Sequence, residues 1–157
     1  MFREMRRKDR ALTAEEAKQF LSEQSYGVLC VLGDEDYPYG VPVNYAYADD
    51  CIYVHGFLEG HKMDAVKKHA KVSFTVFGGT ENLPVDISTN YTSAIAFGTA
   101  SILPPEAEAE RQAAFEAITF KYSPKNENSI SYIQKAGAAA NVIKIQVEQL
   151  TGKRRHS

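Results

Sequence analysis

Residues 54–64 read VHGFLEGHKMD, and this stretch predicts a strand that passes through a turn into the start of a helix. A helix N-terminus presents unpaired backbone N–H groups and the positive end of the helix dipole. Because His61 and Lys62 add side-chain donors there, the stretch is suited to bind an anion, above all a phosphate. An ordinary structural interpretation is also open, in which Lys62 is a solvated helix residue and His61 a capping or surface residue.

The segments on either side follow from hydrophobic periodicity and turn residues. Thr13 and Glu16 form a capping box that begins a helix, and Asp49-Asp50 turns two strands into a hairpin. A connection containing glycine and proline is expected over 78–90. Strands are predicted over 26–32, about 41–47, 51–57, 71–77, 91–102 and 141–149, and helices over 13–24, 60–69, about 104–122 and 129–136, the last ending at Gly137.

This succession of elements is typical of a β-barrel. Six strands with few and short helices indicate a mainly β fold with flanking helices, arranged as a closed or partly closed antiparallel barrel. The helix at 60–69 lies between two strands, so one crossover is expected. Residues 1–157 show no internal repeat and no linker, so we predict a single domain with its own hydrophobic core.

The charges of the chain nearly cancel, with a formal net charge of −2. This balance gives no reason to expect nucleic acid or a membrane as a partner. Basic residues do cluster at both ends, where they are typical of solvated tails, although a phosphate-facing role of the first cluster is an alternative. The clusters comprise Arg3, Arg6, Arg7, Lys8 and Arg10 at the start, and Lys153, Arg154 and Arg155 at the end.

Cysteine usage and hydropathy indicate a cytoplasmic protein. Cys30 and Cys51 lie in apolar, strand-like runs, where buried free thiols of a reducing compartment are expected. No apolar run reaches the length of a membrane span, and the charged N-terminus lacks the apolar core of a signal peptide.

Several catalytic motifs are missing. The sequence has no G-x-G-x-x-G, no G-x-x-x-x-G-K-[ST] and no G-x-S-x-G, which argues against those nucleotide sites and the hydrolase elbow. His55, His61 and His69, with the two cysteines, match no zinc-ligand spacing, so no metal site is expected.

The segment 38–45, PYGVPVNY, is a second candidate binding element. Pro42 inside a strand removes a ladder donor and marks an edge or an opening in the sheet. The Asn44 amide beside such an opening is suited to bind the polar edge of a planar ring, while an edge strand with an ordinary polar face is the alternative. The many tyrosines on or near strands suit a barrel wall or a dimer interface, with one or two available to stack on a cofactor.

These motifs, taken together, resemble a known family. In their order and spacing they are similar to the nitroimidazole-resistance (Nim-type) branch of the pyridoxamine 5′-phosphate oxidase-like flavoproteins. The matching stretches are MRRKDR (5–10), YGVL (26–29), PYGVPVNY (38–45), GHK (60–62), KVSFTV (71–76), TNY (89–91), FG (97–98), KY (121–122) and LTGK (150–153).

The resemblance implies a six-stranded antiparallel split β-barrel that forms a homodimer with two FMN sites at its interface, with FAD as a possible flavin. In the oxidase relatives, a Ser-Arg-Lys at the helix start binds the flavin phosphate. Lys62 matches that lysine and His61 replaces the arginine, a departure typical of the Nim branch, where the histidine is thought to be functional. The remaining implied cofactor-binding residues are Val41, Val43, Asn44 and Tyr45 along the isoalloxazine, His55 and Gly56 beside the phosphate, and Ser93 on a later strand.

The resulting functional prediction is an FMN-dependent oxidoreductase that reduces small electron-poor acceptors such as nitro-aromatics or quinones. The cofactor supplies the chemistry, and the protein supplies position and electrostatics. His61 is either a proton donor or a phosphate ligand, and the second role is favoured. Vitamin B6 oxidation is disfavoured, because the oxidase's C-terminal tryptophan is missing. A flavin carrier or sensor, and a haem-binding barrel with His55 or His61 as axial ligand, are the alternatives.

Overall fold

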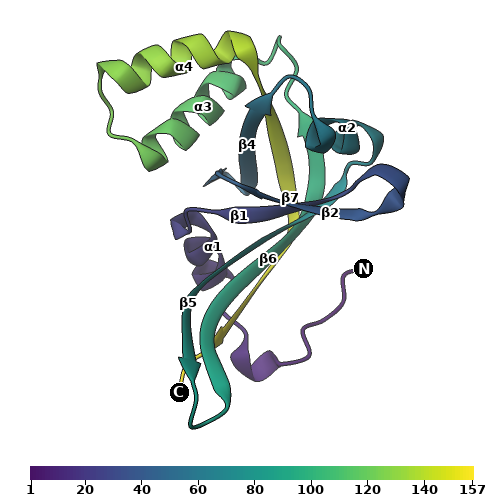
Figure 1. Cartoon of the computed structure of the whole chain (residues 1–157), viewed down its shortest axis with the longest axis vertical. Helices are drawn as coiled ribbons and strands as arrows, with labels where there is room; N and C mark the ends of the chain where they lie inside the picture. Colours follow the sequence, from purple (N-terminus) through teal and green to yellow (C-terminus); the bar gives the residue numbers. More distant parts are fainter.

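The computed structural model describes the backbone of residues 1–157 and every side chain except that of Ala138. Seven strands and four α-helices follow one another, with two short 3-10 helices (Figure 1). The strands are β1 (Gly27–Leu32), β2 (Pro38–Val43), β3 (Ala46–Ala48), β4 (Cys51–Phe57), β5 (Lys71–Leu83), β6 (Ser88–Ile102) and β7 (Ala140–Arg155). The helices are α1 (Ala14–Glu23), α2 (His61–Lys68), α3 (Glu108–Tyr122) and α4 (Glu127–Ala139), with η1 (Lys8–Arg10) and η2 (Asp34–Asp36).

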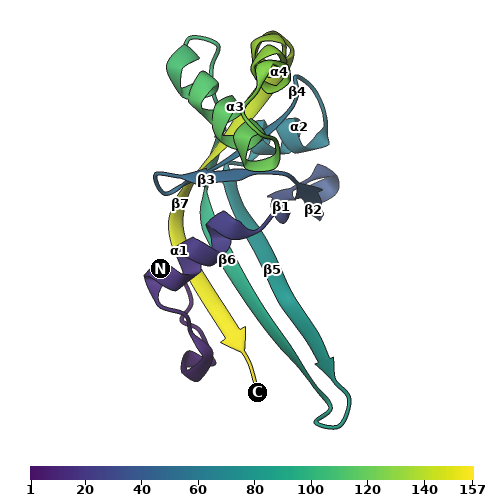
Figure 2. The same ribbon diagram turned by 90° about the vertical axis from the view of Figure 1, so that its left-hand side faces the viewer.

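All seven strands form one antiparallel sheet in the order β2-β1-β5-β6-β7-β4-β3. The edge strands β2 and β3 are separated by only Asn44 and Tyr45, yet within the described chain they do not pair, so the curled sheet is a split barrel. The β5–β6 hairpin projects away from α2, α3 and α4 (Figure 2). The predicted class is therefore confirmed, with seven strands in place of six.

The barrel interior is filled by alternate side chains of the strands. Leu29, Phe74 and Ile145 are fully or almost fully buried, while their neighbours along each strand are less so. Burying one such side chain contributes about 1.5–3 kcal/mol, so this cluster is the main source of stability. A second cluster around Phe115 and Val142 joins α3 and α4 to the barrel.

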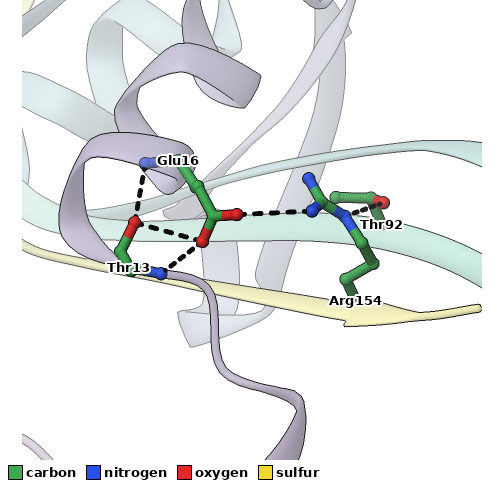
Figure 3. A network of polar contacts seen from close by, with 4 residues as sticks. All are labelled: Thr13, Glu16, Thr92 and Arg154. Carbon is green, nitrogen blue, oxygen red and sulfur yellow. Dashed lines mark hydrogen bonds and ion pairs between the residues drawn. The ribbon is translucent and has the colours of Figure 1, made fainter.

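A polar network fixes α1 to the sheet (Figure 3). Thr13 Oγ1 accepts from the Glu16 N–H at 3.2 Å, and the Glu16 carboxylate accepts from the Thr13 N–H at 2.8 Å, which confirms the predicted capping box. The same carboxylate forms an ion pair with Arg154 of β7 at 3.5 Å, and Arg154 also donates to Thr92 of β6 at 3.4 Å. The prediction of a solvated C-terminal tail is thus wrong, because the chain continues as β7 to Arg155.

The prediction of one strand over 41–47 is also wrong. The strand breaks at Asn44 and Tyr45, so that β2 pairs with β1 while β3 pairs with β4. Tyr45 is fully buried, and the Tyr122 hydroxyl replaces its missing ladder partners: it accepts from the Tyr45 N–H and donates toward the Tyr45 carbonyl, both at 3.0 Å. The break depends on a contact from a distant helix, so the alternation of apolar and polar residues along the strand cannot predict it.

Three predicted boundaries change. The expected connection over 78–90 is shorter, at 84–87, because β5 continues to Leu83 and β6 begins at Ser88, with pairing that resumes past an irregularity between Gly78 and Glu81. The helix after residue 104 begins at Glu108, and α4 runs through Gly137 to Ala139. No helix in the described part of the chain is both long and apolar enough to span a membrane.

Candidate active site

The start of α2 carries a cation held above a glycine. Gly60 is the N-cap, with φ 136°, and contributes no side-chain cap. The Lys62 side chain lies across Gly56 of β4, where an added Cβ would come 3.0 Å from Lys62 Cε and 3.1 Å from Nζ. The absence of a Cβ at Gly56 therefore makes room for the lysine.

Lys62 has no anionic partner in the protein. Among the described residues, no carboxylate forms an ion pair with its ammonium and no group accepts a hydrogen bond from it. A cation at a helix N-terminus is repelled by the dipole unless an anion lies between them. The arrangement therefore fits a phosphate, which satisfies the uncapped N–H groups and the ammonium together.

His61 faces the β1–β2 turn. Its Nε2 accepts from the Asp34 N–H at 3.2 Å and lies 3.9 Å from the Asp34 carboxylate. Its ring stacks on Tyr39 of β2, with the ring centroids 4.1 Å apart and the planes 17° from parallel. His61 thus connects the helix start to the β1–β2 turn through Nε2, which acts as an acceptor, and to β2 through its ring.

A cleft of about 550 Å³ opens between the split and the α3–α4 pair. Such a volume is typical of a site for a small organic molecule. No lining side chain carries a full charge, since the one titratable base, His55, has its pKa lowered by burial first and by nearby Lys62. The cleft is lined by Asn44, His55, Ile118, Thr119, Tyr122, Ser123, Pro124, Asn126, Asn128, Ser129 and Tyr132.

Thr119 provides the clearest sign of a ligand in this cleft. Its hydroxyl is buried and has no hydrogen-bond partner among the described residues. Leaving a buried hydroxyl unpaired costs roughly 1–3 kcal/mol, so the position is unfavourable in a purely structural cleft. A ligand acceptor or donor at Thr119 Oγ1 would remove that cost.

The cleft and the Lys62 site both include residues of β4, along an edge of that strand that has no strand partner among the described residues. β3 pairs only with Cys51, Ile52 and Tyr53, so Val54–Phe57 has a strand partner on the β7 side alone. His55 contributes to the cleft and the adjacent Gly56 to the lysine site. The cleft and the lysine site therefore lie at consecutive residues of one free strand edge.

Residues 13–154 match the family described as pyridoxamine 5′-phosphate oxidase. The chain belongs to this family. No curated protein matches the chain significantly.

Solved structures similar to this family member share its fold. One from Bacteroides thetaiotaomicron, provisionally described as a 5-nitroimidazole antibiotic resistance protein, is 24% identical, with a TM-score of 0.78, covering 92% of this chain and 86% of its own. A FAD-binding protein from Mesorhizobium loti is 23% identical, with a TM-score of 0.69 and coverage of 94% and 98%. A FAD and haem binding protein from Mycobacterium smegmatis is 17% identical, with a TM-score of 0.75 and coverage of 92% and 72%.

The structure of this oxidase-family chain places four of the predicted site residues in two neighbouring features, and the others elsewhere. Asn44 and His55 line the cleft, and Gly56 and Lys62 form the cation site. The remaining side chains lie elsewhere: Val41 and Val43 pack against the core, Tyr45 is fully buried with its hydroxyl bonded to the Leu21 carbonyl, and His61 faces the β1–β2 turn.

Ser93, the last of the predicted site residues, lies far along β6 from the Lys62 site. Ile102 of β6 pairs with Ile143 of β7, which pairs with Val54 of β4 beside the site. Ser93 is nine residues away from Ile102, so at about 3.3 Å per residue roughly 30 Å of strand separates them. Within one subunit it does not reach the Lys62 site.

Of the residues that line the cleft, only Asn44 and His55 were predicted as site residues; Thr119 and Tyr122 are among those that were not. Thr119 and Tyr122 lie on α3, which the sequence predicts only as an alanine- and glutamate-rich helix. The available signal was the position of Thr119 on the apolar face that Phe115 and Ile118 define, since a polar residue on a buried face needs a partner.

Proposed function

We propose that this chain is a flavin-dependent oxidoreductase that binds FMN and reduces small, neutral, electron-poor acceptors. The unpaired Lys62 ammonium above Gly56 at an uncapped helix start carries the proposal. The family match and the FAD-binding structural relatives support a flavin, and a single phosphate fits a single cation site better than a dinucleotide does. FAD remains the alternative flavin.

Each part of the site has a role in this proposal. When bound, the flavin supplies the capacity to accept and donate electrons. Lys62 and the α2 N-terminus hold its phosphate, and the Asn44 amide and the free edge of β4 orient its ring. His61 acts as a positioning residue between α2 and Tyr39. We assign it to the phosphate end and not to proton transfer.

The cleft defines the class of acceptor. Its amide, hydroxyl and aromatic groups suit a planar polar molecule, and the absence of a charged lining residue disfavours an acceptor that carries its own phosphate. Nitro-aromatics and quinones have this chemistry. A Nim-type role in nitroimidazole resistance follows as a proposal, supported by the Bacteroides relative.

We further propose a cytoplasmic homodimer. The outer face of the sheet exposes Phe77, Ile95 and Phe97, with 64%, 38% and 41% of their surface accessible. Grouped apolar side chains of this kind are typical of a subunit interface, most commonly two-fold. Ser93 pairs with Phe77 on this face, so it would reach a flavin only across the interface.

Haem binding is the second candidate, because the cleft holds His55 with a lowered pKa and one structural relative binds both FAD and haem. A neutral imidazole is the form that ligates iron. Against this, no arginine or lysine lines the cleft to pair with haem propionates.

The visible spectrum of the purified protein, followed by anaerobic titration, separates these functions. We expect flavin bands without a Soret band, bleaching by NADH or NADPH, and recovery on adding a nitro-aromatic. A Soret band would favour the haem alternative. Bound flavin that neither bleaches nor passes electrons to the nitro-aromatic would identify a carrier or sensor.

A further inference from the structure

The N-terminal arm pairs with the last part of β7, along the strand edge that faces away from β6. Ala11 forms a bridge with Lys153 of β7, and the Leu12 N–H donates to the Gly152 carbonyl at 2.9 Å. Gly152 makes this close approach possible, since a Cβ there would lie 2.7 Å from Leu12 Cδ1. The N-terminal arm is therefore held against β7.

This docking brings basic residues of both chain ends to the part of the sheet that carries Tyr91. Tyr91 of β6 is in register with Arg155, and its neighbour Ser93 is in register with Lys153. The Lys153 ammonium lies 5.5 Å from the centroid of the Tyr91 ring, and Arg155 donates to the Thr89 carbonyl at 3.2 Å. We call the set of Arg7, Arg10, Tyr91, Lys153 and Arg155 the terminal patch.

The terminal patch holds more positive than negative charge. Asp9, the acid between Arg7 and Arg10 in the sequence, already forms a two-pronged pair with Arg7 at 2.8 and 2.5 Å. Within the described chain, neither Arg10 nor Lys153 forms an ion pair. The pKa of the Tyr91 phenol is lowered, by Lys153 first and also by Arg10.

The patch is also distinct from its surroundings. Arg154, between Lys153 and Arg155, points to the opposite face, where Glu16 and Thr92 bind it. The chain as a whole has a formal net charge of −2, so the patch is not part of a generally basic surface. It borders the apolar face of Phe77, Ile95 and Phe97, because Ser93 pairs with Phe77.

We propose that the terminal patch is a binding site for the phosphate or pyrophosphate group of a small molecule, separate from the site at Lys62. Lys153 lies on β7 beside Tyr91, and Arg10 directly precedes the Ala11–Lys153 bridge, so two cations without an ion-pair partner can bind adjacent phosphate oxygens through charge-assisted hydrogen bonds. A nucleic acid needs a longer basic track that follows several phosphates, and this patch is confined to one end of two strands.

Calorimetric titration with sodium pyrophosphate at low ionic strength tests the proposal. The FMN-saturated protein is compared with the double variant Arg10→Gln/Lys153→Gln and with the matched control Arg154→Gln, which removes a neighbouring charge on the other face. Lys62→Met is titrated without flavin. This variant lacks the cation of the proposed flavin site, so pyrophosphate that it binds is bound elsewhere. Removing two charge-assisted contacts should weaken pyrophosphate binding by at least about 10-fold, while the control and Lys62→Met should each change it less than about twofold.

A spectroscopic readout tests the same residues independently. Bound pyrophosphate offsets the positive charge near Tyr91, so the pKa of Tyr91 should rise in wild type. In the double variant, pyrophosphate should not change this pKa. Phenolate absorbance measures it, with Tyr91→Phe as the reference. ADP that displaces pyrophosphate identifies a nucleotide ligand; ADP that does not displace it identifies a free phosphate compound. The proposal is overturned if wild type does not bind pyrophosphate, if the double variant binds as well as wild type, if Lys62→Met abolishes binding, or if a single-stranded oligonucleotide binds the patch more tightly than pyrophosphate.

Discussion

At the scale of single residues, substitution of Thr119 tests whether the cleft binds a ligand or is only structural. Its hydroxyl is buried without a partner, and valine keeps the branched shape while removing that group. We expect Thr119→Val to raise the free energy of unfolding of the ligand-free protein by about 1 kcal/mol. Chemical denaturation would measure the change.

The same substitution should harm ligand binding. If the hydroxyl binds the acceptor, Thr119→Val loses one neutral hydrogen bond and weakens acceptor affinity about 2- to 10-fold. Flavin content is the control and should not change. A variant that is less stable than wild type, with unaltered acceptor affinity, would contradict a ligand role for Thr119.

Residues whose role depends on local sequence were predictable. Lys62 directly follows Gly60-His61 at a helix start, so its position beside uncapped N–H groups could be predicted from spacing alone. Thr119 could not be assigned a role, because the sequence does not show that α3 packs against the split. His61 was placed at the correct helix end, but its contact with Asp34 depends on a turn 27 residues earlier.

At the scale of elements, the Tyr122 hydroxyl closes the gap between β2 and β3. It accepts a hydrogen bond from the N–H of the fully buried Tyr45 and lies within donating distance of the Tyr45 carbonyl. It also lies 2.6 Å from the Ser25 carbonyl. Tyr122→Phe leaves the N–H and carbonyl of Tyr45 without this partner, so we expect unfolding to become easier by roughly 1–3 kcal/mol. Tyr37→Phe, on a residue that is 73% exposed, is the matched control and should cost less than about 0.5 kcal/mol. Equal stability of the two variants in urea would show that the hydroxyl does not support the break.

Lys121 connects the same elements and makes stability depend on pH. Its ammonium donates to the Gln24 carbonyl at 2.6 Å and lies 3.8 Å from the centroid of the Tyr45 ring. Burial lowers the pKa of Lys121 to about 8, from an ordinary value of 10.5. Between these values the unfolded chain binds the proton more tightly than the folded chain, so the free energy of unfolding rises with pH.

The expected result is a gain of stability between about pH 8 and pH 10 that disappears in Lys121→Met. Urea denaturation at several pH values measures it, with Lys135→Met on exposed α4 as the control that should retain the wild-type dependence. If Lys121→Met retains the same pH dependence as wild type, Lys121 is not the titrating group.

At the scale of the whole molecule, the outer sheet face predicts assembly. We expect a homodimer at micromolar concentration, with flavin retention falling on dilution, measured by sedimentation velocity. Phe97→Asp should give a folded monomer with reduced flavin content, because Phe97 is 41% exposed and is not required by the core. Ile130→Asp on α4, at the same exposure, is the control and should remain dimeric. A wild-type monomer that holds stoichiometric flavin would rule out an interface site.

The sequence predicted the barrel class well and the barrel's details less well. Alternation along β1, β4 and β5 reflects burial on one face, which is a local property. The split at Asn44, the extension of β5 and β6, and the course of β7 past Gln149 depend on pairing between distant segments. The resemblance to a flavoprotein family came from the order of many short motifs, and the family match bears out its coarser part.

The central claim is that Lys62 and the start of α2 bind a flavin phosphate. Titration of apo-protein with FMN and with riboflavin, which lacks the phosphate, tests it most directly. A lost charge-assisted contact is worth roughly 1.5–3 kcal/mol, so Lys62→Met should weaken FMN binding about 10- to 150-fold. The matched control Lys68→Met, at the other end of the same helix, should bind FMN as wild type does. Riboflavin should bind wild type and both variants alike. If Lys62→Met binds FMN as tightly as wild type at low salt, Lys62 does not bind the flavin phosphate.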